Sequence, residues 1–325
     1  MGGLAEAAEK FVEPIGKLID CVSGAIGKAY KPRHIRNVAD AEAYKIKKIG
    51  EALRENSDIP IEYNPEGISL STIDYEQFIK RTQNRLAFQE LKKQENIEAV
   101  ADKAYHLLEG EEQVTADPVE EDWMLRFFNC VEDISNEKMQ KIWARILAGE
   151  IKKPDSFSLR TLDALHNISP NEAQLFEKVI NSGVVFDCIP NKHSFWDNHG
   201  ISYADIMKLE ECGLINAGGM LTLTKSFADQ MAVIMYSNDR VLVYKNELYP
   251  QKNDLVIDVF PLTTSGLQIA SLFVESLTNS QLEDVGIFLR EEAKDATFHI
   301  YPIITSENGT FQINTNVDFL PPKQR

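Results

Sequence analysis

The segment from residue 117 to 183 carries dense helix signals and constrains the fold more than any other part of the sequence. Asp117-Pro118-Val119-Glu120 and Ser169-Pro170-Asn171-Glu172 each place a capping side chain, a proline at the first helical position and a glutamate at the third. We therefore predict a capped four-helix region over residues 117–183. Two apolar stripes lie between the caps, and we expect the helix of the second stripe to end at Gly149. The first stripe is Trp123, Phe127, Val131 and Ile134, and the second is Met139, Ile142, Trp143, Ile146 and Leu147.

The preceding segment, residues 72–116, has a different character. Apolar positions recur at helical spacing from residue 72 to residue 108, which predicts one long helix that acts as an arm or a strut. Residues 109–122 contain seven acids and no base, which indicates a solvated linker. We assign residues 72–116 to a long helical arm and an acidic linker.

The N-terminal segment, residues 1–55, begins with an amphipathic stretch. Apolar residues spaced by three and four lay one stripe along a helix between residues 4 and 30, and Pro14 is expected to kink or divide that helix. The stripe either forms an oligomer or membrane-docking surface or covers the protein's own core, and its charged residues exclude a membrane-spanning helix. The candidate interface residues are Leu4, Phe11, Ile15, Leu18 and Val22.

The second part of that segment, residues 28–54, is clearly basic. Beside an amphipathic helix, such a stretch can hold anionic lipid or phosphate, or it can be a solvated helix face whose charges pair with the acidic remainder of the chain. The turn formers over residues 56–71 then predict a loop. The candidate anion-binding residues are Lys31, Arg33, Arg36, Lys47 and Lys48.

The C-terminal segment, residues 184–325, predicts a mixed α+β region with a winged-helix-like module. A capping box at Ser202 opens a helix that Gly213 ends, and a strand follows at 221–224. A further strand at 255–262, a helix from Thr264 and a hairpin across the Asn308-Gly309 turn complete the region. The predicted fold class is mainly α, with a helical N-terminal region, a central helical bundle and an α+β C-terminal half.

The charge of the chain argues against nucleic acid as a partner. The formal net charge is -16, and residues 183–325 hold 10 Lys and Arg against 18 Asp and Glu, a difference of -8. A winged helix that reads DNA uses the second helix of its pair, but the helix that begins at Tyr203 carries three acids and one lysine. We expect contact with protein, and a winged-helix transcriptional regulator that binds DNA is the alternative.

The residue patterns predict no catalytic residue, no cofactor and no metal. Nucleotide-binding loops and hydrolase motifs do not occur in a suitable context. The cysteines are scattered without a CxxC pair, and the start of the sequence lacks a secretory signal, so we expect a cytoplasmic protein. If the N-terminal helices bind lipid, the protein is peripheral to the inner membrane. Four residues have zinc-binding side chains, but their spacing does not match known zinc fingers, and we expect buried thiols and loop histidines instead: Cys188, His193, His199 and Cys212.

Two runs of sequence carry a family resemblance. Asp133-Ile134-Ser135-Asn136-Glu137-Lys138-Met139-Gln140, followed by Ile142-Trp143-Ala144-Arg145-Ile146-Leu147-Ala148-Gly149-Glu150 and Ser169-Pro170, resembles an uncharacterised bacterial group known as a domain of unknown function and similar to the abortive-infection alpha type. The opening Gly3-Leu4-Ala5-Glu6-Ala7, with Pro14-Ile15-Gly16, is similar to the N-terminus of that type. The resemblance implies phage defence and defines no catalytic residues. We expect a non-enzymatic sensor or effector that acts through protein contacts or self-association.

Overall fold

The computed structural model describes residues 11–26, 72–112, 114–219, 221–273, 277–293, 296–307 and 310–321. The chain divides into two compact units, Met1–Leu162 and Asp163–Arg325. The boundary lies within helix α6 (Leu159–His166), inside the segment 117–183. The mixed α+β composition is confirmed, because helices dominate the first unit and antiparallel sheets lie in the second.

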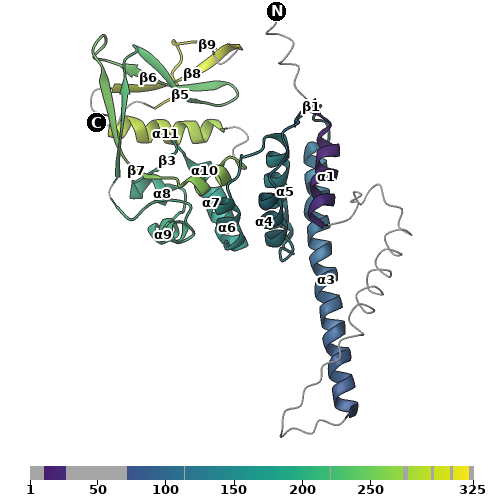
Figure 1. Cartoon of the computed structure of the whole chain (residues 1–325). Coiled ribbons are helices and arrows are strands. Elements are labelled where there is room, and N and C mark those ends of the chain that lie inside the picture. Colours follow the sequence, from purple (N-terminus) through teal and green to yellow (C-terminus); the bar gives the residue numbers. More distant parts are fainter. Residues whose placement is uncertain are drawn as a thin grey trace, which may run out of the picture. The chain divides into compact units, whose positions relative to one another are not determined.

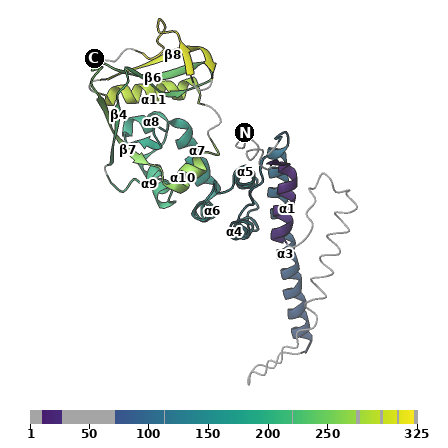
Figure 2. The same cartoon turned by 45° about the horizontal axis from the view of Figure 1, so that its top comes forward.

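The first unit is built on α3 (Thr72–Leu108), which coincides with the predicted long helix. Packed around its C-terminal part are α1 (Pro14–Ile26), α4 (Glu121–Val131) and α5 (Glu137–Lys152). Figure 1 and Figure 2 both show α1 alongside α3. The short strands β1 (Phe11–Val12) and β2 (Val114–Thr115) pair antiparallel. The predicted apolar stripes meet in the core, where Phe127, Trp143 and Leu147 are fully buried.

Two local predictions for this unit are wrong, and a third is wrong in part. Of the two alternatives at Pro14, the kinked helix is wrong, because Pro14 begins α1 at the first helical position, where no N–H donor is needed. The helix expected at Pro118 starts at Glu121, because residues 114–115 pair as β2 and the chain stays extended through Glu120. Helix α5 continues past Gly149, where the missing Cβ leaves room for the ring of Phe157.

A buried ionic group fastens α1 to the rest of the first unit. Lys17 is 8% exposed, and its Nζ donates to the carbonyl oxygens of Thr115 at 3.1 Å and Ile151 at 3.0 Å. Burial lowers the pKa of Lys17, although Cys21 and Glu150 act in the opposite direction. These contacts bring α1, β2 and the C-terminal turn of α5 together.

The second unit alternates helices and strands along the chain. Its elements are α7 (Pro170–Ser182), β3 (Cys188–Pro190), α8 (His193–Asn198), α9 (Tyr203–Glu211), β4 (Leu221–Phe227), β5 (Met231–Tyr236), β6 (Arg240–Asn246), β7 (Asn253–Pro261), α10 (Thr264–Ala270), α11 (Asn279–Glu292), β8 (Ala296–Glu307) and β9 (Thr310–Ile313). The strands form two antiparallel sheets, ordered β3-β7-β4 and β5-β6-β8-β9.

Most of the predicted signals of this unit are confirmed. Capping boxes open α7 at Ser169 and α9 at Ser202, and Gly213, with φ of 71°, follows α9. The expected strands are β4 and β7, and the expected C-terminal pairing is that of β8 with β9, whose turn residues lie outside the described part of the chain. Helix α11 covers one face of the four-stranded sheet in both views.

Candidate functional site

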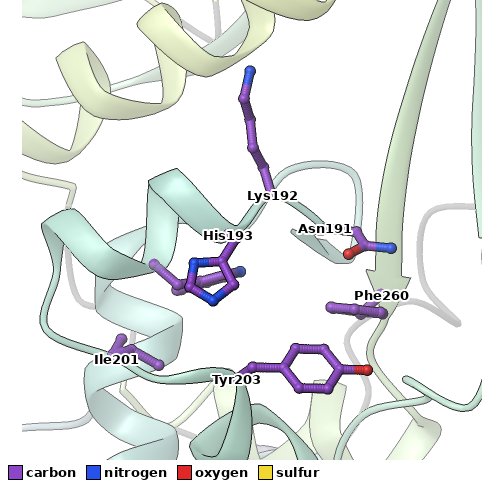
Figure 3. A pocket seen from close by; sticks show the side chains of 7 residues that line it. Asn191, Lys192, His193, Ile201, Tyr203 and Phe260 are labelled. Atoms are coloured by element: carbon purple, nitrogen blue, oxygen red, sulfur yellow. The ribbon is translucent and has the colours of Figure 1, made fainter.

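A pocket in the second unit lies among α8, the start of α9 and the end of β7 (Figure 3). Its volume of about 220 Å³ is below the ~300–1,000 Å³ of typical small-molecule sites. A cavity of this size suits a single side chain or a small fragment of a ligand. It is lined by Asn191, Lys192, His193, Trp196, Ile201, Tyr203 and Phe260.

The pocket has an apolar floor and an exposed aromatic rim. Trp196 and Phe260 are only 4% and 3% exposed, whereas Tyr203, the first residue of α9, is 53% exposed. Figure 3 shows the rings of His193, Tyr203 and Phe260 around one space. His193 is fixed within its own helix, with its Nδ1 2.7 Å from Asp197 Oδ2. The pocket therefore presents rings and aliphatic surface to whatever enters it.

The strongest polar groups of the lining residues are held by partners inside the unit. The indole Nε1 of Trp196 donates to the carbonyl oxygen of Pro190 at 2.6 Å. Lys192 Nζ lies 2.8 Å from Glu291 and 2.7 Å from Glu292, both on α11. Burial acts to lower the pKa of Lys192, but the bonds to these two carboxylates outweigh it and raise the pKa above its ordinary value. Lys192 therefore links the pocket wall to α11 through two ion pairs.

One face of β7 extends from the pocket as an acidic stripe. Asp254 is exposed and Asp258 is half-buried. The alternation of side chains along a strand places both on one face with Phe260, which forms the pocket wall. The hydroxyl of Thr222 donates to Asp258 Oδ1 at 2.9 Å. The hydroxyl of Ser226 donates to Asp254 Oδ1 at 2.5 Å. Both carboxylates are therefore held in place by strand β4.

The candidate interface residues of the N-terminal helix are placed mostly inside the first unit. Leu18 and Val22 are fully buried and Ile15 is half-buried, as expected for a helix that covers the protein's own core. Phe11 lies in β1, and Leu4 is outside the described residues. Within the described ranges, no helix combines the length and the apolar character needed to span a bilayer.

The candidate anion-binding residues Lys31, Arg33, Arg36, Lys47 and Lys48 all lie outside the described residues.

The four residues with zinc-binding side chains have separate surroundings. Cys188 is buried in β3. His199 Nδ1 lies 2.8 Å from the carbonyl oxygen of Phe195. Burial, with the neighbouring Glu172 carboxylate, raises the pKa of Cys212 to about 11. Across the described part of the chain, no group of three or more His, Cys, Asp and Glu is arranged to hold a metal ion.

Sequence reasoning did not single out the pocket. Trp196 carries no recognisable motif, and Tyr203 is distinguished in the sequence only as the first residue of the helix that Ser202 caps. The available signal was the strand at residues 254–260, where Asp254, Val256 and Asp258 alternate with buried apolar residues until Phe260 breaks the pattern. A buried aromatic residue on the polar face of a strand indicates that something covers it there.

Comparison with known proteins supports an uncharacterised family. One family model, described as Protein of unknown function (DUF2806), matches residues 80–285. No curated protein and no solved structure shows significant similarity to the chain. The expectation of a domain of unknown function is confirmed at that level. Because the match spans more than half of its residues, the chain belongs to this family of proteins of unknown function.

Proposed function

We propose that this chain is a non-enzymatic protein-binding protein whose second unit captures an apolar side chain of a partner in the pocket among α8, α9 and β7. The observation that carries the proposal is the combination of a buried apolar floor with an exposed rim residue, Tyr203. Binding energy at protein interfaces concentrates where an aromatic residue such as Tyr or Trp meets a well-packed pocket. A partner side chain would complete such a pair here.

The arrangement of polar groups favours binding over catalysis. Acid–base or nucleophilic chemistry needs a reactive group directed at a substrate, supported by a second group within hydrogen-bond reach. At this pocket, Lys192 is paired with Glu291 and Glu292, and His193 is paired with Asp197 at an exposed rim. These pairs stabilise the walls and leave the apolar surface for the ligand.

The order of elements supports the finer proposal of a winged-helix module. The run α7-β3-α8-α9-β4-β7, with the sheet ordered β3-β7-β4, places a helix pair beside a three-stranded sheet. Strands β5 and β6 are inserted between β4 and β7 and join the second sheet. In this proposal α9 is the helix that would read DNA in a DNA-binding relative.

Charge favours protein over DNA as the ligand of that module. Residues 163–325 contain 11 Lys and Arg against 21 Asp and Glu, a difference of -10. The lysine of α9, Lys208, is bound to Asp205 at 3.1 Å. We expect no binding of the full chain to a random 30-bp duplex at 50 mM salt, measured by fluorescence anisotropy. Submicromolar binding that weakens steeply with salt would favour the alternative, a transcriptional regulator.

A role in phage defence is the biological part of the proposal, and the resemblance of residues 133–150 and of the N-terminus to the abortive-infection alpha type supports it. The chain would then act as a sensor or effector whose signal is a protein contact. We expect bacteria that carry the gene to reduce plaque formation by at least one phage, and Tyr203→Asp to abolish the protection. If that variant protects the bacteria as well as the wild type does, the pocket has no role in the defence.

A peptide selection tests the binding function directly. Random peptides displayed on a carrier are selected against the full chain, and the selected peptides are then titrated against Tyr203→Ala and against Tyr236→Ala, a control with a similarly exposed tyrosine (56%) on β5. We expect the peptides to share one large apolar residue and to bind Tyr203→Ala about tenfold more weakly, with little change for the control. If the selected peptides bind Tyr203→Ala as tightly as the wild type, the proposal is contradicted.

A further inference from the structure

We infer that the partner is an extended, basic protein segment that places one apolar side chain in the pocket and lies along the exposed face of β7. Its Lys or Arg side chains pair with Asp258 and Asp254. This inference rests on the proposed protein-binding function and adds the chemistry of the partner.

The elements that carry the pocket rim and the acidic stripe have a net negative charge. The elements α9, β4 and β7 together carry five acids and two lysines: Asp205, Glu210, Glu211, Asp254 and Asp258 against Lys208 and Lys225. Of the two lysines, Lys208 is bound to Asp205, and Lys225 lies over the ring of Phe186 at 5.5 Å from its centroid. Complementary charge steers association and selects among partners. A segment that seats a side chain in the pocket therefore meets a negative surface.

The spacing of the stripe fits an extended chain. Asp258 is directly linked to the pocket, because its carbonyl oxygen accepts a hydrogen bond from the Asn191 N–H at 3.0 Å. At ~3.4 Å per residue, Phe260, Asp258 and Asp254 span about 20 Å along β7. An extended partner has the same repeat, so its alternate side chains meet the alternate residues of this face. Six to seven partner residues cover the distance.

The recognition is made by side chains. β7 is the central strand of the β3-β7-β4 sheet, so both of its backbone edges are already paired. Within the described ranges, the hydroxyls of Thr222 and Ser226 each bind the Oδ1 atom of one carboxylate, and no donor is bound to either Oδ2. A cationic side chain can reach these Oδ2 atoms. Between them, Val256 is 50% exposed and offers apolar contact to a lysine or arginine stem.

Three synthetic peptides test the inference on the full chain. The first has thirteen residues, with leucine at the centre, lysine at every second position on both sides and serine between them, so that it can bind in either direction. The second has glutamate in place of lysine, and the third has serine in place of the leucine. We expect the lysine–leucine peptide to bind, its Kd to rise between 50 and 200 mM NaCl, and the other two to bind at least tenfold more weakly.

A pair of variants with equal net charge separates the stripe from the general field of the molecule. Asp254→Asn combined with Asp258→Asn is expected to weaken binding by about fivefold or more. Asp229→Asn combined with Asp239→Asn, at two exposed positions outside the stripe, is expected to leave binding unchanged. Circular dichroism confirms that each variant is folded.

The outcomes distinguish the inference from the function on which it rests. If the glutamate peptide binds as well as the lysine peptide, or if both double variants behave alike, the basic partner is wrong. If Tyr203→Ala still loses peptide binding in that case, the proposed capture of an apolar side chain in the pocket remains supported. If the serine substitution in the peptide has no effect, the proposed capture of an apolar side chain fails as well.

Discussion

Gly266 offers a sharp test of how the second unit is packed. It lies in α10, and a Cβ atom added to it would meet the backbone oxygen of Leu214 at 2.0 Å. The N-cap residue of α10 holds the same backbone, since Thr263 N donates to Leu214 O at 3.0 Å and its Oγ1 donates to Gly213 O at 2.6 Å. The glycine is therefore required by a close approach of two backbone segments.

The substitution Gly266→Ala sets opposing effects against each other. Alanine is favoured over glycine in a helix by ~0.8–1 kcal/mol. Overpacking against a backbone atom costs ~1–3 kcal/mol, and loss of the bond between Thr263 and Leu214 costs another ~0.5–1.5 kcal/mol. The steric and hydrogen-bond costs exceed the gain in propensity. We expect the free energy of unfolding of the second unit to fall by about 1–3 kcal/mol.

Scanning calorimetry with a helical glycine as control decides the matter. Gly16 in α1 has no atom within 4 Å of an added Cβ, so Gly16→Ala should stabilise the first unit by up to ~1 kcal/mol. A domain of this size shifts its Tm by ~2–4 °C per kcal/mol. We expect Gly266→Ala to lower one transition and Gly16→Ala to raise one. An unchanged or raised Tm for Gly266→Ala would refute the packing argument.

Three further predictions concern buried and capping groups. Lys17→Met should destabilise the first unit by ~1–2 kcal/mol in urea titrations, because two carbonyls lose their donor. Burial lowers the pKa of Lys17, so the stability of the wild type should also rise as the pH approaches 10.5. The variant should lack this rise. Trp196→Phe should cost the second unit ~1–3 kcal/mol by leaving the Pro190 carbonyl unpaired, so unchanged urea stability argues against that bond. Hydrogen bonds from their N-cap serines lower the pKa values of Glu172 and Asp205 from 4.5 and 3.8. Both carboxylates therefore contribute stability that is lost as the pH falls through these lowered values. Glu172→Gln and Asp205→Asn should each make the free energy of unfolding depend less on pH below 4.5, and acid profiles equal to that of the wild type would count against the capping boxes.

Local signals in the sequence predicted the helices well because each cap depends on neighbouring residues. The capping boxes at Ser169 and Ser202 need only the side chain three positions later. The two wrong ends in the first unit have long-range causes. Pairing of β2 with β1 delays α4, and the ring of Phe157 occupies the space beside Gly149. Neither partner can be found by inspecting the segment itself.

Strands β5 and β6 of the second sheet and the pocket were beyond sequence reasoning for the same reason, whereas the hairpin of β8 and β9 has a local turn signal. Strand β6 is buried because it pairs with β8, which lies some sixty residues later in the chain. The pocket combines side chains from β7 with those of α8 and α9, and its rim residue Tyr203 has the sequence context of an ordinary first helical residue. The sequence could predict the elements and their polarity, but only the pairing of β3 with β7 brings the pocket walls together.

A double-mutant cycle across the pocket tests the central claim most directly. The Kd of the lysine–leucine peptide is measured for the wild type and Tyr203→Ala, each with leucine or alanine at the centre of the peptide. Direct contact predicts that the two changes interact by ~0.5–3 kcal/mol. If the two losses add within ~0.3 kcal/mol, the apolar side chain does not bind beside Tyr203, and the account of this pocket as the binding site is contradicted.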